Sequence, residues 1–536
     1  MADYGKLLVN VTTDTGQFPI QNARVTIYVI ETTIPVNRQL LEGEQRGDEQ
    51  SPGRQLSEGV SEANPEGSMI PDAESWMEGS VNGTNSFDLG NQMEENAANS
   101  SVEERQTGEN ADNLPGTTSQ AEENRTYMQA PTDIFRQADI TIPSSELQTR
   151  LSDAMFLENL ETDESGQTRE VELETPPLQY SEAPNEPRPY KNYILEIQAD
   201  GYETALIIGV EMFPDVTAIQ NVQLRNPETG RALLNRGAGT TVHLIIIPPH
   251  TLYREYPPKI PESEIKPIDE TGEIVLSRVV IPEYIIVHDG VPSDSSAPNY
   301  YVRYKDYIKN VVSSEIYSTW PESTIYANTL AIMSFTLNRV YTEWYRNKGY
   351  NFTITSSTAY DQKWIYGRNI YSNINYLVDS IFANFVSRPG VRQPLFTSYC
   401  DGSRVSCKGL SQWGSKTLGE QGFSALQILR YYYGNDVYIN TADTISGVPA
   451  SWPGYNLGIG ARGEKVRQLQ NQLNRIGRNY PAIGQVAADG IYGQNTANAV
   501  RTFQRVFSLP VTGVVDYATW YEISNIYTAV ARLSEP

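Results

Sequence analysis

Apolar and polar residues alternate in two short runs near the start of the chain, GKLLVNV at residues 5–11 and ARVTIYVI at residues 23–30. A period of two places every apolar side chain on the same face, as in a β-strand that is buried on one side. The segment between the two runs contains Gly and Pro, which are typical of turns. We therefore predict two strands that face one core within residues 1–31.

The alternation disappears between residues 32 and 138, where the chain is rich in Glu, Asn, Gln, Ser, Gly and Thr. Such a composition cannot bury enough apolar surface to offset the entropy of ordering, so we predict that residues 32–138 are a disordered acidic insertion. Alternation resumes in EVELET and NYILEIQ further along the chain. We predict that residues 1–31 and 139–230 together form an all-β sandwich, with the insertion as an overgrown loop.

The next segment, residues 231–283, holds one predicted apolar strand, VHLIII, followed by many prolines. Proline favours extended chain that packs poorly, so we predict a semi-rigid linker here. His243 and His250 belong to this segment, and we interpret both as structural or solvated side chains. A second linker is predicted at residues 441–457.

Helical spacing dominates residues 284–440, which we predict to be an α+β domain. Ile308, Val311 and Val312 recur on one face of YKDYIKNVVSSEIY, and a second helix is predicted to begin after Trp320-Pro321-Glu322. A third amphipathic helix is predicted for NINYLVDSIFANFV at residues 373–386. Within residues 458–530, two further helix faces are predicted, and the turns DGIYG and TGVVD separate the helices. The first face consists of Val466, Leu469, Leu473 and Ile476, and the second of Ala499, Phe503 and Val506.

Composition and charge argue against several classes of protein. The net charge is −24, which argues against nucleic acid as a general partner, although much of the acid lies in the predicted insertion. Only two Cys and three His are present, so neither a disulfide scaffold nor a His-rich metal site is expected. No apolar stretch approaches the length of a membrane span, and MADYGKLLVNV lacks the basic and apolar regions of a signal peptide. The sequence gives no indication of the oligomeric state.

Glu315, in the first predicted helix, is a candidate catalytic carboxyl group. It follows Val311 by one turn and therefore falls on or beside the apolar face. A carboxylic acid in an apolar site can remain protonated near neutral pH and can then act as a general acid. The alternative is a helix-end Glu that turns to solvent or pairs with Lys309 or Arg303, and the helix alone does not decide between them.

The downstream motifs favour the catalytic alternative. VVSSEIYSTWP, ANTLAIMSFTLNRV, TSSTAYDQKWIYG and GLSQWGSKTLGEQGFSALQILRYYYG follow one another in the order and spacing of the catalytic domain of the stage II sporulation protein D / LytB family, which residues 284–440 resemble. The resemblance implies a lytic transglycosylase that cleaves peptidoglycan glycan strands with Glu315 as general acid and base. Asp361, the nearest other carboxylate, is interpreted as loop structure. The substrate-binding residues implied by the motifs, each with loop ordering as the alternative, are Gln362, Tyr366, Ser411 and Gln412.

This stretch also departs from the family. Many members carry Gly-His-Gly-Val-Gly before the Ser-Gln pair, where this chain has Cys407-Lys408-Gly409-Leu410. Some members bind zinc through a Cys pair and a nearby His, and Cys400, Cys407 and His288 are the three candidates for such a structural zinc here. A structural zinc normally takes four ligands. Free thiols or a disulfide therefore remain the alternatives, and the proposed chemistry requires no cofactor.

Two other resemblances complete the picture. Residues 458–530 resemble the peptidoglycan-binding domain 1 family through GARGEKVRQLQ, DGIYGQNT, AVRTFQ and TGVVDYATW, and the resemblance implies a three-helix module. In that module Asp489 and Tyr492 either line the ligand groove or order their turn. The N-terminal phrases PIQNARVTI, TDESGQT and IQADGYET resemble carboxypeptidase-regulatory-like modules, which are mostly adhesive or spacing domains.

The sequence therefore predicts a multidomain bacterial cell-wall enzyme whose partner is peptidoglycan glycan. The alternative is a non-catalytic cell-wall or spore-envelope binding protein with a degenerate central domain. Since no export signal is visible, we expect a mother-cell or spore-associated protein that reaches the wall after lysis, or by a non-classical or phage-like route.

Overall fold

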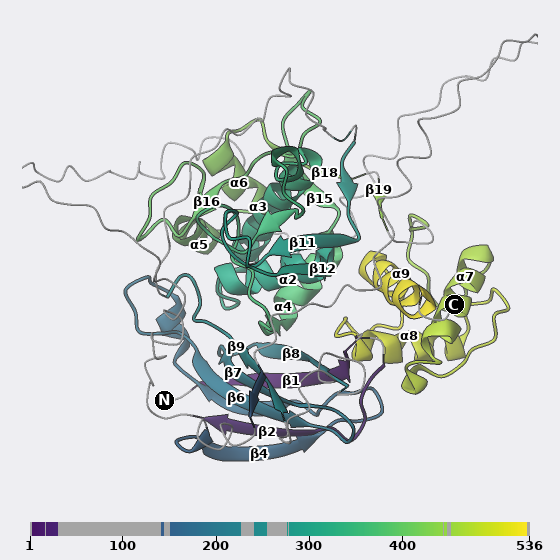
Figure 1. Cartoon of the computed structure of the whole chain (residues 1–536). Helices are drawn as coiled ribbons and strands as arrows, with labels where there is room; N and C mark the ends of the chain where they lie inside the picture. The colour runs from purple at the N-terminus through teal and green to yellow at the C-terminus, as the bar shows by residue number, and fades with distance from the viewer. Residues whose placement is uncertain are drawn as a thin grey trace, which may run out of the picture. The chain divides into compact units, whose positions relative to one another are not determined.

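The computed structural model describes residues 3–29, 141–143, 151–226, 241–253, 276–446 and 452–532, except residues 15, 17, 277 and 443. This described part is mixed α/β, with several sheets and eight α-helices (Figure 1). The predicted disordered insertion, residues 32–138, lies outside it. None of the described helices is both long and apolar enough to cross a membrane.

The first strands of the chain assemble into two sheets. Their orders are β14-β8-β1-β5 and β3-β9-β7-β6-β2-β4. The strands are β1 (Asp3–Thr13), β2 (Arg24–Val29), β3 (Thr141–Pro143), β4 (Met155–Glu161), β5 (Val171–Thr175), β6 (Lys191–Gln198), β7 (Thr204–Met212), β8 (Thr217–Leu224) and β9 (Thr241–Ile246), with β14 (Ile370–Tyr371) contributed by a later segment.

Alternation in the sequence explains how the two sheets share a core. Leu7 and Val9 of β1 are fully buried, as are Val25 and Ile27 of β2 in the other sheet, and all four belong to one apolar cluster. The two strands predicted from the N-terminal runs are thus confirmed. Figure 1 shows β1 beside β8, with which it pairs in parallel register.

The segments expected to be linkers contribute strands of their own. β9 lies within residues 231–283 and pairs in parallel with β7, so VHLIII belongs to the six-stranded sheet. Further along, β10 (Val280–Ile281) pairs in parallel with β19 (Thr444–Ile445), which lies in the second expected linker. Such pairings join residues far apart in sequence, and no local pattern predicts them.

The central part, from residue 284 onward, combines helices with short strands. A three-stranded sheet has the order β12-β11-β13, and two-stranded sheets pair β15 with β18 and β16 with β17. The elements in chain order are β11 (Tyr284–His288), β12 (Asn299–Arg303), α2 (Tyr304–Glu315), α3 (Glu322–Tyr341), β13 (Ile354–Thr355), α4 (Ser372–Ile381), β15 (Asn384–Ser387), β16 (Tyr399–Cys400), β17 (Leu410–Ser411), α5 (Gln412–Glu420), α6 (Ala425–Tyr433) and β18 (Tyr438–Thr441).

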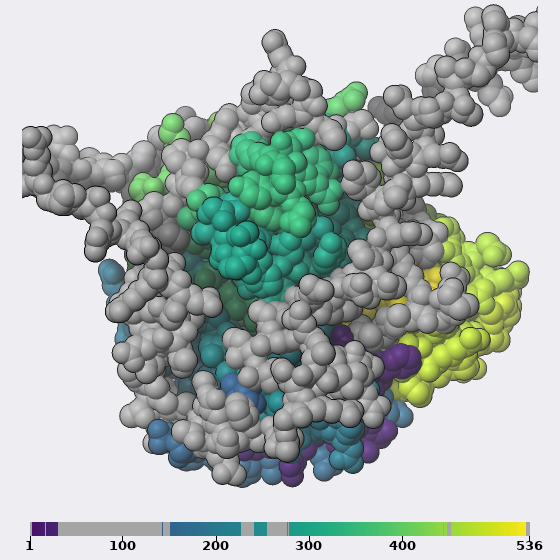
Figure 2. Space-filling view, viewed as in Figure 1, coloured from purple at the N-terminus to yellow at the C-terminus, as the bar shows by residue number. Residues whose placement is uncertain are grey.

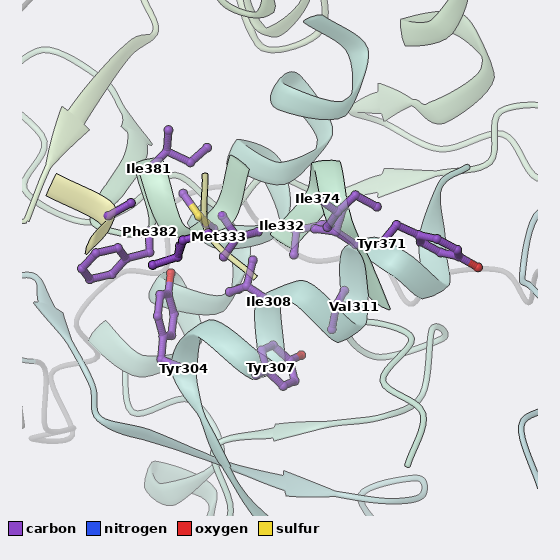
Figure 3. Close-up of a cluster of buried hydrophobic side chains, with 14 of the residues drawn as sticks. Tyr304, Tyr307, Ile308, Val311, Ile332, Met333, Tyr371, Ile374, Ile381 and Phe382 are labelled. Atoms are coloured by element: carbon purple, nitrogen blue, oxygen red, sulfur yellow. The ribbon is translucent and has the colours of Figure 1, made fainter. Parts of the chain in front are cut away.

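Helix α2 is the centre of this part and the helix predicted from the Ile308, Val311 and Val312 repeat. Eleven of its twelve residues are buried, because α3 and α4 pack against it. Figure 3 shows Ile308 and Val311 directed into the cluster that Ile332 of α3 and Ile374 of α4 also enter. The apolar stripe of α2 therefore packs into the core, as its helical spacing predicts.

The prediction for the third helix is wrong over its last residues. Helix α4 ends at Ile381, and Asn384–Ser387 form β15, which pairs with β18 in antiparallel register. The backbone N–H of Val386 also donates to Ser334 Oγ on α3 at 3.0 Å. Phe385 and Val386 are buried in the strand, and an apolar run of this length fits a buried strand as well as a helix.

A buried ion network ties α2 to α4. Asp379 of α4 is 1% exposed and accepts from Lys309 at 2.9 Å, and Lys305 approaches its other oxygen at 3.0 Å. Lys305 also pairs with Glu522, on the last helix of the chain. Burial alone would raise the pKa of Asp379, but the two lysines outweigh it and hold that pKa below the ordinary value.

Asp379→Asn should therefore destabilise the protein by about 3–5 kcal/mol, because two buried lysines lose their counter-charge. A lowered pKa means that the stabilisation is present above the ordinary Asp pKa of about 4 and is lost as the pH falls through the lowered value. Thermal unfolding between about pH 7 and pH 2 should show the two proteins converging only at acid pH.

Glu420→Gln is the matched control. Its partner Lys416 lies one helical turn away and Glu420 is 47% exposed, so the loss should be at most about 0.5 kcal/mol. Equal losses in the two variants would show that the network around Asp379 is not what holds α2 to α4.

Candidate functional site

Glu315 is the last residue of α2 and is fully buried. The helix ends there because Ile316 turns to extended backbone, with φ −132° and ψ 161°. The two residues after it, Ile316 and Tyr317, are buried as well. The expected position of Glu315 beside the buried apolar face is therefore confirmed, and the alternative of a solvent-facing Glu is wrong. The positions expected to pair with it are engaged elsewhere, Lys309 with Asp379 and Arg303 with Asn525.

Donors from three separate segments reach the Glu315 carboxylate within the described part of the chain. The backbone N–H of Lys363 donates to Oε1 at 2.8 Å, and the Tyr399 hydroxyl donates to the same oxygen at 3.2 Å. Gln412 Nε2 donates to Oε2 at 3.1 Å. A buried carboxylate requires such partners, since an unpaired one would be costly. The donors hold the group in one orientation.

Gln412 is the one predicted substrate-binding residue that touches Glu315. It opens α5 and is fully buried. In this bond the Gln412 amide nitrogen faces Glu315 and its Oε1 faces away. Within the described structure this Oε1 is buried without a hydrogen-bond partner. It is an acceptor available for an N–H or O–H group beside the carboxylate.

Tyr399 and Gln412 are brought together by a small parallel pairing. Tyr399 lies opposite Leu410 and Cys400 lies opposite Ser411, so β16 and β17 run side by side. Ser411 then caps α5 by accepting from Gly414 N at 2.9 Å. Ser411 is thus a helix cap rather than a free ligand group, although it remains partly exposed.

The two cysteines form a disulfide, one of the alternatives left open by the sequence. Cys400 and Cys407 are bonded with an S–S distance of 2.14 Å. His288 lies elsewhere: its Nδ1 contacts Asn299 Oδ1 at 2.8 Å, and its ring stacks on Phe352 at 4.4 Å. Among the residues that the structure describes, no three His, Cys, Asp or Glu side chains form a group that could hold a metal ion.

Gln362 is placed differently from its predicted role. It is fully buried, and its Oε1 accepts from Tyr307 at 3.0 Å and from Thr336 at 2.8 Å. Its Nε2 donates to the Ile332 carbonyl at 3.0 Å. Both ends of the Gln362 amide are hydrogen-bonded inside the core, so a sugar cannot reach it without disrupting the packing of α2 on α3. Loop ordering, the stated alternative, is the role the geometry gives it.

The other members of the same loop also serve structure. Asp361 is fully buried and accepts from Arg339 at 2.7 Å and from Tyr345 at 2.6 Å, which agrees with its interpretation as loop structure. Tyr366 is half-buried, with one ring face stacked on Tyr300 at 5.3 Å. Lys363, which the motif did not single out, supplies the donor to Glu315. A backbone N–H leaves no signal in side-chain identity, so the sequence could not reveal it.

The far end of the loop is fixed by a second buried ion pair. Arg368 lies 2.5 Å from Glu211 of β7, and both side chains are almost fully buried. His250 contacts the same carboxylate at 3.4 Å. Burial would raise the pKa of Glu211, but Arg368 and His250 outweigh it and lower that pKa. His250 is therefore structural, one of its two predicted interpretations.

Helices α7 (Glu464–Ile476), α8 (Gln494–Val506) and α9 (Tyr517–Arg532) form the C-terminal module, yellow-green to yellow in Figure 1 and in the space-filling view of Figure 2. Two buried glutamines hold its turns. Gln470 accepts from Gly490 N at 2.8 Å and donates to Asp489 at 3.0 Å, while Gln504 accepts from Gly513 N at 2.8 Å.

The two predicted ligand residues of the module therefore differ. Asp489 is exposed and orders its turn by accepting from Ile491 N at 2.8 Å. Tyr492 is 1% exposed, and its hydroxyl donates to the Gly513 carbonyl at 3.0 Å. Tyr492 is a core residue, so turn ordering, the alternative to groove lining, describes its role.

Residues 462–523 match the family model of a peptidoglycan binding domain. The match covers the helical module and includes the Gln470 and Gln504 turns. The C-terminal module is a peptidoglycan-binding domain, and the chain is accordingly a cell-wall-associated protein with peptidoglycan as a partner. No solved structure matches the chain.

A fragment spanning residues 452–532 should bind purified sacculi by itself, because the family match falls within these residues and Leu469, Phe503 and Trp520 are buried among the three helices. Pelleting of sacculi with the fragment, followed by gel analysis, measures the binding. Circular dichroism of the same sample controls for folding. A helical fragment that stays in the supernatant would show that the module needs the rest of the chain to bind.

Proposed function

We propose that the central domain is a peptidoglycan lytic transglycosylase with Glu315 as its single general acid and base. The observation that carries the proposal is the buried Glu315 carboxyl group, oriented by donors from three separate segments. The motif resemblance of residues 284–440 supports the same role. The C-terminal peptidoglycan-binding domain supplies the attachment to the wall.

In the proposed reaction Glu315 protonates the glycosidic oxygen between N-acetylmuramic acid and N-acetylglucosamine. The muramoyl 6-hydroxyl attacks the anomeric carbon, and Glu315 takes up the hydroxyl proton, which leaves a 1,6-anhydro end. A hydrolase would need a second carboxylate to activate water or to act as a nucleophile, whereas this ring closure does not. The arrangement fits a mechanism with one carboxyl group, because Asp361, the nearest other candidate, is paired with Arg339.

Gln412 and Lys363 shape the surroundings of the acid. Gln412 Oε1, buried without a partner, is placed to accept a hydrogen from a sugar hydroxyl or acetamide group beside Glu315. Burial lowers the pKa of the Lys363 ammonium, as does the charge of Arg368, while Glu315 and Asp289 oppose the shift. Because Glu315 is fully buried, the segments that cover it have to open for a glycan strand to enter.

The full burial of Glu315 favours a second candidate, a wall-binding protein whose central domain does not cleave. In that case the carboxylate serves only to tie together the three segments that donate to it. Mass spectrometry of denuded glycan strands after incubation separates the two candidates. The transglycosylase releases anhydro-muramoyl ends, and the binding protein releases none while it still pellets with sacculi.

Glu315→Gln should abolish cleavage, with a rate loss of about 10²–10⁴, because an amide cannot exchange the proton. The fold should survive. The Lys363 N–H can still donate to an amide oxygen, and the Gln412 amide can flip so that its free Oε1 accepts from the new nitrogen. Anhydro-muramoyl ends and thermal unfolding should be measured on the same preparation.

Glu322→Gln is the matched control. Glu322 is exposed in the first turn of α3, so this substitution makes the same chemical change away from the site. It should leave cleavage at the wild-type rate. An E315Q protein that cleaves as fast as this control would remove Glu315 from the mechanism.

A further inference from the structure

The disulfide lies between the two side chains that donate to Glu315. Tyr399 directly precedes Cys400, and Gln412 follows Cys407 by five residues, across the short strand β17. The bond lies in the connection between β16 and β17, because it joins Cys400, the last residue of β16, to Cys407, which precedes Leu410 at the start of β17.

The loop itself is mostly exposed, whereas Cys400 and Asp401, where it begins, are buried. Residues Gly402 to Arg404 are exposed and Cys407 is partly exposed, but Cys400 and Asp401 are 1% exposed. The Asp401 carbonyl accepts from Trp413 N at 3.1 Å, which links the loop to the first turn of α5. A reductant can therefore reach the disulfide at Cys407, while the other cysteine lies beside Asp401, which is bonded to α5.

We propose that the Cys400–Cys407 disulfide is a positioning element of the site, which holds Tyr399 and Gln412 against Glu315 only while it is oxidised. The proposal rests on the proposed transglycosylase activity for its catalytic consequence. A short closed loop restricts how far β16 and β17 can separate, and both donors are carried at the ends of that pair. Opening the loop leaves the short pairing of β16 with β17 and the bond from Trp413 N–H to the Asp401 carbonyl as the backbone contacts that keep the two donors together.

The chemistry is a two-electron exchange with a thiol reductant. A dithiol attacks one sulfur, forms a mixed disulfide and closes on itself, which leaves two protonated or ionised Cys thiols and an oxidised reductant. Reducing compartments keep such cysteines as thiols, and oxidising surroundings outside the membrane retain the bond. The site would accordingly be assembled after the protein reaches the wall.

The chain offers a clean test, because these are its only two cysteines. Dithiothreitol-treated and untreated protein should be compared on soluble denuded glycan, with alkylation and mass measurement to count reduced thiols. We expect kcat to fall by roughly tenfold to a hundredfold on reduction, as misplacement of an oriented group produces. Binding to sacculi through residues 462–523 should be unchanged.

Hydrogen exchange supplies a readout that does not depend on activity. A disulfide that merely tethers its own loop should change exchange only between residues 401 and 408 and at Trp413, whose N–H is bonded to the Asp401 carbonyl. Positioning of the site predicts faster exchange also at the amide N–H of Lys363, which is bonded to Glu315. If the Lys363 amide exchanges equally fast before and after reduction, the proposal is overturned, whether or not the protein cleaves glycan.

The double variant Cys400→Ser/Cys407→Ser is the matched control. It should match the reduced protein in kcat and in exchange at Lys363, and dithiothreitol should not change it further. A double variant as active as the oxidised protein would overturn the proposal. If the oxidised protein releases no anhydro ends at all, the proposed function fails, and exchange at Lys363 alone decides the positioning role.

Discussion

The central part of this protein depends on the burial of one carboxyl group at the end of a helix. Glu315 has no exposed surface, so its oxygens must find donors within the protein. Those donors come from Lys363, Tyr399 and Gln412, which belong to a loop, the short strand β16 and the start of α5. The requirement to satisfy one group thus fixes the relative positions of segments that lie 48, 84 and 97 residues from Glu315 in sequence. An arrangement of this kind orients an acid for chemistry and also stabilises the fold.

The loop that carries Lys363 connects this site to the N-terminal sheets. It begins at Asp361, which Arg339 holds, and ends at β14, which pairs with β8 in the four-stranded sheet. Between them Arg368 makes its buried pair with Glu211, and removing one partner of such a pair typically costs about 3–5 kcal/mol. The N-terminal sheets are therefore bonded to the loop that holds the site, which goes beyond the adhesive or spacing role that sequence resemblance implies.

Local patterns predicted the elements whose own periodicity reports one buried face. The alternation of β1 and β2 and the stripe of α2 each report such a face, and burial of that face is what the structure shows. The predictions failed where pairing with another strand decided the outcome. Residues 384–386 were expected to be helical, yet they pair with β18. VHLIII was expected to be a strand within a linker, and it is a strand, yet it pairs with β7 in the six-stranded sheet. In both cases the local pattern does not report the partner strand, and hydrogen bonding to that partner decides where the residues belong.

The same division applies to the candidate site. The sequence by itself determined that Glu315 follows an apolar stripe, that two cysteines lie seven residues apart and that the C-terminus carries a peptidoglycan-binding module. Gln362 and Gln412 are equivalent in the sequence, as polar residues within motifs. Only the tertiary structure places the first in the core against Thr336 and the second against Glu315. The reason is that an amide has no intrinsic preference among partners, so its role is decided by which groups the folded chain brings within hydrogen-bonding distance.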